Sequence, residues 1–113
     1  MIKIYHNNRC SKSRNGLEIL EKSGKDFEII KYLDDVPSAK ELKGIINLLE
    51  IKPIDLVRKN EAIWKENFKN KDLTDADIIA AMLKYPKLIE RPIIINGNKA
   101  VIGRPPELIS SIL

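Results

Sequence analysis

The sequence has one cysteine and one histidine among its 113 residues. A single cysteine excludes an intrachain disulfide, and with one histidine it cannot form a structural zinc site, so we predict no metal centre. No apolar run approaches the roughly 18–20 residues that cross a bilayer, which predicts no membrane span. The segment MIKIYHNNRC lacks the apolar stretch of a secretory signal, and this absence favours a cytoplasmic location.

Aromatic residues make up only 5% of the chain, and they are not interleaved with a basic stripe as in a nucleic-acid platform. The net charge is +4, from 20 basic and 16 acidic side chains, which is weaker than a basic arm that grips phosphates. Residues 1–25 carry six of the basic and two of the acidic groups. This local excess fits a small anionic substrate at least as well as nucleic acid, and we predict no nucleic-acid partner.

Arginine is also scarce, with five arginines against fifteen lysines: Arg9, Arg14, Arg58, Arg91 and Arg104. In so lysine-rich a chain, we interpret arginine as a residue kept where a planar, permanently charged donor fork is needed. Arg58, Arg91 and Arg104 each stand at a junction between expected elements, and three converging guanidinium groups would hold a tetrahedral oxyanion. Scattered surface ion pairs are the alternative, which the sequence leaves open. Arg14 is expected to be solvated.

The first third of the chain predicts a βαβ unit. Residues 2–5 alternate as in a strand, residues 11–23 have a helical period ending at Gly24, and residues 27–33 are apolar enough for a second strand. The two strands should be parallel, with a right-handed crossover.

The middle of the chain predicts helices. Ser38 with Glu41, and Thr74 with Asp77, have the spacing of capping pairs ahead of helical apolar stripes, and Pro53 suits a short helix between them. Tyr85 and Pro86 should end the last of these helices. Trp64 and Phe68, four residues apart, are interpreted as packing residues.

The last third predicts two strands and a helix. Residues 93–95 and 99–102 are the strands, joined by an Asn-Gly turn. Pro105 and Pro106 open a terminal helix with Leu108, Ile109, Ile112 and Leu113 facing inward. The order is α/β, a thioredoxin-like βαβ…ββα arrangement. We predict a single domain over residues 1–113, with a helical insertion at roughly 37–86 between the two halves.

Cys10 stands between the first strand and the first helix, where backbone N–H groups and the helix dipole favour a thiolate. Arg9, Lys12 and Arg14 add positive charge nearby. We therefore predict a reactive nucleophile, and the alternative is a small buried apolar side chain. Cys10 and Ser13 form a C-x-x-S motif, which permits a covalent adduct but cannot resolve one within the chain.

Two neighbours of Cys10 are candidates for assisting its thiolate. Ser13 either hydrogen-bonds the sulfur or lies in the first helical turn without a chemical role. His6, at the exit of the first strand, either stays cationic near the thiolate or orients the loop through a hydrogen bond. A purely structural histidine is the further alternative.

Four blocks resemble, in family order, the thioredoxin-fold arsenate reductases that use glutathione and glutaredoxin: HNNRCSKSRN at 6–15, LVRKN at 56–60, RPII at 91–94 and GRP at 103–105. The resemblance covers essentially the whole chain. It implies that Cys10 attacks arsenate and that Arg58, Arg91 and Arg104 bind the oxyanion. It also implies that His6 assists thiolate formation, and that the bond between Arg91 and Pro92 is cis.

The implied enzyme binds no resident cofactor and uses glutathione as a co-substrate. A thio-arsenate on Cys10 would be resolved by glutathione, and glutaredoxin would reduce the remaining mixed disulfide. The expected partners are thus arsenate or a similar oxyanion, glutathione and glutaredoxin. Two alternatives are a glutathione-dependent thiol-disulfide oxidoreductase and a non-enzymatic regulator that binds RNA polymerase in thiol stress. Regulators of that kind typically carry C-x-x-C, so Ser13 argues against the second.

Overall fold

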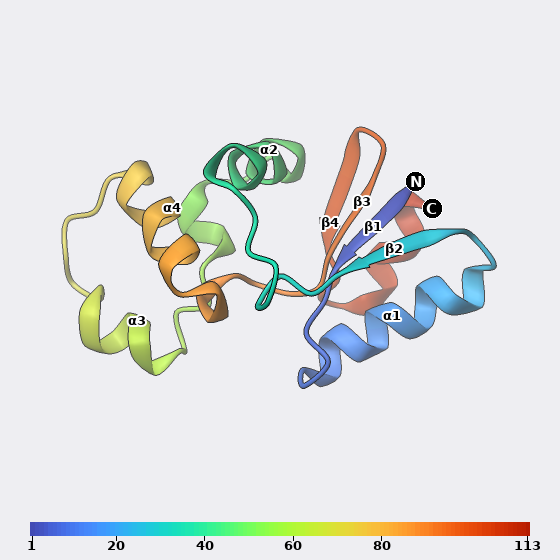
Figure 1. Ribbon diagram of the computed structural model, residues 1–113, viewed down its shortest axis with the longest axis horizontal. Coiled ribbons are helices and arrows are strands. Elements are labelled where there is room, and N and C mark those ends of the chain that lie inside the picture. The colour runs from blue at the N-terminus through green and yellow to red at the C-terminus, as the bar shows by residue number, and fades with distance from the viewer. The chain divides into compact units, whose positions relative to one another are not determined.

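The computed structural model describes residues 1–113, which form two compact units (Figure 1). The sheet unit consists of Met1–Asp35 and Arg91–Leu113, and the helical unit is Val36–Glu90. The insertion expected at residues 37–86 falls inside the helical unit. That the whole chain forms a single domain stays a prediction.

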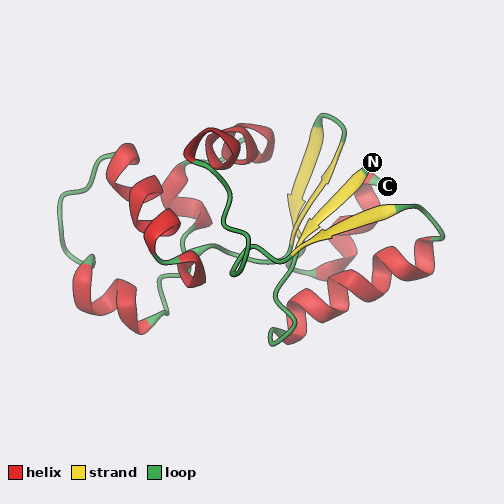
Figure 2. Cartoon of the chain, viewed as in Figure 1, coloured by secondary structure: helices red, strands yellow, loops and turns green.

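The sheet unit is built on a four-stranded mixed sheet with the strand order β2-β1-β3-β4 (Figure 2). Its elements are β1 (Ile2–Tyr5), α1 (Ser11–Ser23), β2 (Phe27–Ile30), β3 (Ile93–Asn96), β4 (Lys99–Ile102) and the 3₁₀ helix η3 (Pro106–Ile112). β1 pairs in parallel with β2 and antiparallel with β3, which pairs antiparallel with β4. The predicted parallel strands and hairpin are confirmed. Gly97 at the hairpin turn has a φ of 63°, the left-handed conformation that glycine adopts without strain.

The core of the sheet unit is formed by residues from both the N-terminal and the C-terminal segments of the chain. Ile4 of β1 and Ile94 of β3 are fully buried together with Leu20 of α1 and Ile109 of η3. α1 ends at Gly24, whose φ of 73° gives the expected left-handed cap. This packing fixes the end of β1, from which the chain turns into α1.

Two expectations for this unit were wrong in detail. β2 ends at Ile30 instead of continuing to residue 33, because the Lys31 carbonyl accepts the N–H groups of Asp34 and Asp35 at 3.0 and 2.8 Å and turns the chain. The C-terminal helix is 3₁₀ and has three residues per turn, so Ile109 faces inward while Leu108 is 43% exposed.

The helical unit contains α2 (Ala39–Leu49), η1 (Pro53–Leu56), α3 (Ala62–Asn67), α4 (Asp75–Lys84) and η2 (Pro86–Leu88). The Ser38 hydroxyl accepts the Glu41 N–H at 3.1 Å at the start of α2. Thr74 and Asp77 bond each other's backbone N–H groups at 3.0 and 3.1 Å at the start of α4. Both predicted helix starts are confirmed.

The short helix α3 was not predicted from the sequence. No side chain caps it, so it lacks the local signal that marked the other helices. Its Trp64 stacks on Phe68 with ring centroids 5.5 Å apart, and Phe68 meets Tyr85 edge-on at 6.1 Å. The prediction that these aromatic residues pack is confirmed.

Candidate active site

Cys10 is the N-cap residue of α1, directly after the turn that follows β1. Its N–H donates to the Asn7 carbonyl at 3.1 Å, and its carbonyl accepts the Arg14 N–H at 3.0 Å. The thiol is free and half-buried. Because no hydroxyl or carboxylate caps this helix, the N–H groups of its first turn are available to the sulfur.

The surroundings of the sulfur favour the thiolate. Burial raises the pKa of the Cys10 thiol, but hydrogen bonds outweigh that effect and the pKa lies below its ordinary value. The favourable contacts are, in decreasing order, the Ser13 backbone N–H, the Arg91 side chain and the Lys12 backbone N–H. These are the helix-start and cationic contacts that generally activate a cysteine.

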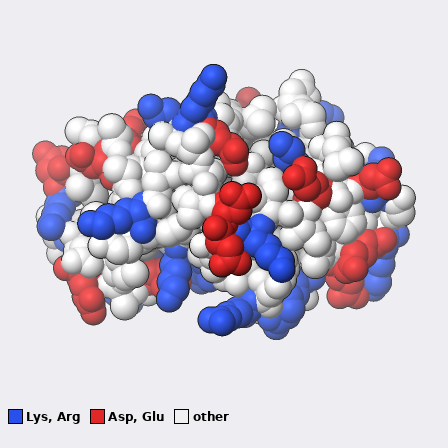
Figure 3. Space-filling view, viewed as in Figure 1, with Lys and Arg blue, Asp and Glu red and all other residues white.

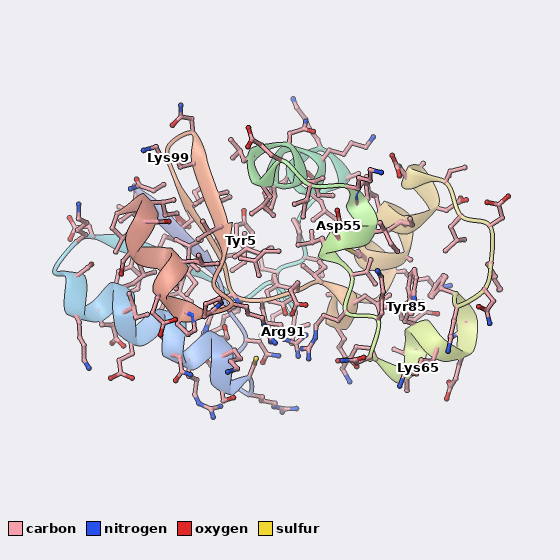
Figure 4. All side chains as sticks on the ribbon, turned by 180° about the vertical axis from the view of Figure 1, so that it is seen from behind. Tyr5, Asp55, Lys65, Tyr85, Arg91 and Lys99 are labelled. Carbon is pink, nitrogen blue, oxygen red and sulfur yellow. The ribbon has the colours of Figure 1, made fainter.

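Arg91 and Arg104 lie near the sulfur at the open end of the β3–β4 hairpin. Arg91 precedes β3, and Arg104 follows β4. Nη2 of Arg104 lies 3.6 Å from Cys10 Sγ, and its Nε donates to the Arg91 carbonyl at 2.8 Å. Arg91 is only 8% exposed. Figure 4 shows it at the end of the sheet where α1 begins, far from Lys99 at the hairpin turn. Antiparallel pairing thus brings two arginines that are 13 positions apart to one place.

Each of these arginines precedes a cis peptide bond, Arg91–Pro92 and Arg104–Pro105. The first bond was predicted and is confirmed. The second was not predicted.

Two glycines allow close packing around Pro92, one from α1 and one from the segment after β4. A Cβ atom on Gly16 of α1 would lie 2.9 Å from Cγ of Pro92, and a Cβ on Gly103 would lie at the same distance from the same atom. Real Cβ atoms do not come so close to a neighbour, so both positions require glycine unless Pro92 shifts. The close approach keeps the start of α1, and hence Cys10, near the hairpin arginines.

Ser13 is fully buried and connects the strand exit to the turn. Its Oγ lies 2.6 Å from His6 Nδ1 and accepts the Asn7 N–H at 3.0 Å. We assign the single hydroxyl proton to the bond with Nδ1, because Nδ1 is the available acceptor and a neutral ring then carries its proton on Nε2. The hydroxyl therefore organises the loop, whereas Ser13 reaches the sulfur through its backbone N–H.

His6 is 2% exposed and lies directly after β1. Burial lowers the pKa of His6, and the charges of Lys31 and Arg14 act in the same direction, while the Asn8 side chain opposes them. A neutral imidazole is therefore favoured. The bond to Ser13 is the loop-orienting contact that was one of the alternatives for this residue.

Arg58 lies in the helical unit, between η1 and α3. Its N–H donates to the Leu88 carbonyl at 2.7 Å, and its guanidinium lies 3.9 Å from Glu61 and 3.7 Å from Glu90. The side chain is thus anchored within its own unit. Its convergence with the two hairpin arginines stays a prediction.

Two contacts that brace the turn were missed from the sequence. Asn7 Oδ1 accepts the Arg9 N–H at 3.0 Å, and Arg14 Nη1 donates to the Asn8 carbonyl at 2.9 Å. The first has a sequence signal, since asparagine often bonds the backbone two residues ahead in turns. Arg14 carried no such signal, and although it is exposed as expected, it also holds the loop.

No group of three or more His, Cys, Asp or Glu side chains lies together as metal ligands would. None of the helices is long and apolar enough for a membrane crossing.

On the face seen in Figure 3, basic and acidic side chains are interspersed rather than separated by sign. The site offers a thiolate beside guanidinium groups, which can bond covalently to an electrophilic oxyanion.

Comparison with known proteins gives consistent matches. Residues 5–112 match the sequence model of the ArsC family. The chain is 44% identical to an arsenate reductase of Haemophilus influenzae over 97% of each chain, and 40% identical to the uncharacterized protein YfgD of Escherichia coli over 99% of this chain and 96% of that one. It superposes on an arsenate reductase from Vibrio cholerae with a TM-score of 0.94 at 43% identity, covering 99% of this chain and 97% of that one. This match confirms the predicted thioredoxin-like α/β fold.

Proposed function

The chain belongs to the ArsC family, and on that premise we propose that it reduces arsenate with Cys10 as the nucleophile. The observation that carries the proposal is the position of Arg104 Nη2, 3.6 Å from Cys10 Sγ. Arg91 supports it, because its side chain also favours the thiolate. Guanidinium groups this close to a thiolate can bind the anion that the thiolate attacks.

In the first step the Cys10 thiolate attacks arsenic(V) and forms a sulfur–arsenic bond, while one arsenate oxygen takes up protons and leaves as water. Arsenic remains pentavalent in this thio-arsenate. Arg91 and Arg104 neutralise the charge on the remaining oxygens through hydrogen bonds that are already oriented. Arg58 is expected to supply a third guanidinium.

In the second step a glutathione thiolate attacks the Cys10 sulfur. A disulfide forms, and the electron pair of the sulfur–arsenic bond goes to arsenic, which leaves as arsenite. A thiol of glutaredoxin then attacks the glutathione sulfur and releases Cys10. Because Cys10 is the only cysteine, no disulfide within the chain can replace the external thiols.

His6 and Ser13 assist the thiolate indirectly in this proposal. Their side chains bond each other, and Ser13 holds the Asn7 N–H, so together they fix the turn that ends at Cys10. The backbone N–H of Ser13 then points to the sulfur.

The test is to incubate reduced, thiol-free protein with arsenate and to count covalent adducts and arsenite. We expect one adduct per chain and no arsenite until glutathione is added, then sustained turnover with glutaredoxin present. Cys10→Ser is the control and should form neither product. Repeated turnover without an added thiol contradicts the mechanism. No adduct and no turnover with the complete system contradicts arsenate reduction itself.

The alkylation rate of Cys10 against pH tests the activated thiol separately. We expect a midpoint below the value of about 8.5 for an ordinary thiol, because the hydrogen bonds to the sulfur favour the thiolate. A midpoint at or above that value contradicts an activated nucleophile.

A glutathione-dependent thiol-disulfide oxidoreductase is the second candidate. One observation favours it: the free, half-buried thiol at a helix start is accessible to a disulfide as well as to an oxyanion. Turnover of a glutathione mixed disulfide without any arsenate reduction would select this candidate. Both activities fit a cytoplasmic location, where glutathione keeps thiols reduced.

A further inference from the structure

A cavity of about 260 Å³ lies on the sheet unit, on the turn before Cys10. Its walls come from residues 6–9 and from the turn after β2, residues 31–34. The Cys10 N–H closes the turn 7–10 by donating to the Asn7 carbonyl at 3.1 Å. The cavity and the reactive cysteine are therefore joined by a single tight turn.

The cavity is lined by a buried histidine whose ring has an unsatisfied nitrogen. His6 lines it and is 2% exposed, and Nδ1 is bonded to Ser13. Nε2 is buried and has no hydrogen bond of good geometry, and the Asn8 side chain, which lines the same cavity, is the polar group that acts on the ring. Because the Ser13 hydroxyl donates its hydrogen bond to Nδ1, the neutral ring carries its own proton on Nε2, which is therefore an N–H donor. A buried donor without a partner costs stability, and a ligand acceptor would satisfy it.

The charged side chains around the cavity have both signs. Arg9 and Lys31 are cationic and Asp34 is anionic, and none of the three forms an ion pair. Asp34 would weaken the binding of a simple oxyanion, whereas a group with an ammonium and a carboxylate would be attracted at both ends. The cavity therefore fits the α-amino-carboxylate of an amino-acid-like ligand.

Resting on the proposed function, we propose that this cavity binds the γ-glutamyl end of glutathione and so directs its thiol toward the adduct on Cys10. Lys31 and Arg9 take the α-carboxylate, Asp34 takes the ammonium group, and His6 Nε2–H donates to a ligand oxygen. The volume is just below the roughly 300–1,000 Å³ typical of small-molecule pockets, so it suits one end of the tripeptide. The rest of the molecule would then lie outside, along the turn.

Binding of S-methylglutathione to the Cys10→Ser protein tests the site without chemistry. We expect amide NMR shifts in residues 6–9 and 31–34, and about tenfold weaker binding in Lys31→Gln and in Asp34→Asn, the loss of one charged hydrogen bond. Lys99→Gln and Asp26→Asn remove the same charges elsewhere on the sheet unit and should bind as the parent does. Equal binding by all four variants, or shifts confined to other residues, overturns the proposal.

Fragments of glutathione show which end of the tripeptide the cavity binds. γ-Glutamylcysteine should bind at the same residues, and cysteinylglycine should bind at least about tenfold more weakly, since it lacks the charged pair that Lys31 and Asp34 recognise. Equal binding of the fragments, or displacement of S-methylglutathione by inorganic phosphate, overturns the assignment of the γ-glutamyl end.

Turnover distinguishes this proposal from the proposed function. If the parent protein reduces arsenate and Lys31→Gln has an unchanged KM for glutathione, the cavity is not the thiol site while the function stands. If S-methylglutathione binds as described but the protein reduces no arsenate, the function fails and the cavity assignment stands.

Discussion

The sheet unit and the helical unit both have buried apolar cores, but they differ in how far apart in the sequence the contacts lie that define their elements. In the sheet unit, Ile4 and Leu20 from the start of the chain pack with Ile94 and Ile109 from its end. In the helical unit, α4 is started by its own sequence, through the reciprocal bonds of the Thr74 capping box. Cys10, the proposed nucleophile, belongs to the unit whose geometry depends on long-range pairing.

This difference shows how each arginine is positioned. Arg91 and Arg104 flank paired strands, and Arg104 bonds both the Arg91 carbonyl and the Cys10 sulfur. Arg58 is held within the helical unit by two carboxylates of that unit. We therefore expect the hairpin arginines to act on the cysteine itself, and Arg58 to act only on the bound anion.

The largest expected effect is the loss of arsenate reduction in Arg91→Lys, which distinguishes the hairpin arginines from Arg58. Arg91→Lys keeps the charge but loses the planar fork, so kcat/KM for arsenate should fall by about 10- to 100-fold, the equivalent of about 1.5–3 kcal/mol for a charged hydrogen bond. The alkylation midpoint of Cys10 should rise as well, because Arg91 favours its thiolate. Steady-state kinetics and alkylation against pH measure the two effects.

Arg58→Lys is the matched change in the helical unit. It should raise KM for arsenate and leave the Cys10 alkylation midpoint unchanged. The comparison breaks down if Arg91→Lys behaves like the parent protein in both assays, or if Arg58→Lys moves the midpoint as far as Arg91→Lys does.

The next effect concerns the packing of the sheet unit. Gly16→Ala places a Cβ atom 2.9 Å from Pro92 and 3.1 Å from Ile109. Overpacking costs about 1–3 kcal/mol and alanine recovers about 1 kcal/mol of helix propensity, so we expect a net loss of up to about 2 kcal/mol. Urea unfolding, with amide hydrogen exchange in α1, measures it. A variant more stable than the parent protein would show that α1 and the hairpin do not pack this closely.

The same contrast explains what the sequence could predict. The Thr74–Asp77 box and the Asn-Gly turn at Gly97 were predictable because the chemistry that forms them lies within a few residues. The end of β2 was missed although the turn that ends it is equally local, because the apolar and aromatic residues through Leu33 continue the pattern of a strand. The position of Cys10 between a strand and a helix was evident from the sequence, but the bond between Ser13 and His6 depends on packing that no local pattern encodes.

A smaller effect tests the buried histidine of the sheet unit. Because burial lowers the pKa of His6, the unfolded chain binds a proton below about pH 6.5 before the folded chain does, and stability should fall as the pH drops through that range. One proton limits the slope to about 1.4 kcal/mol per pH unit. Urea unfolding at pH 7 and pH 5.5 should show the loss in the parent protein and a flatter dependence in His6→Asn.

The ring of His6 also gives a direct measurement, since it is the only histidine in the chain. Its proton NMR signal should titrate with a midpoint below about 6.5. A midpoint above that value would contradict a buried neutral imidazole, whatever the unfolding data show.

The smallest effect is the counterpart of Gly16→Ala in the helical unit. Gly44 lies in the middle of α2, is exposed, and has no atom within 4 Å of the position that a Cβ would occupy. Gly44→Ala should therefore stabilise the protein by about 0.4–1 kcal/mol, through helix propensity and a less flexible unfolded chain. Since both substitutions add one methyl group inside a helix, the difference between them isolates the contacts with Pro92 and Ile109. Amide exchange should slow in α2 alone. Destabilisation by Gly44→Ala would mean that this face of α2 is packed, and that the two units do not differ as described.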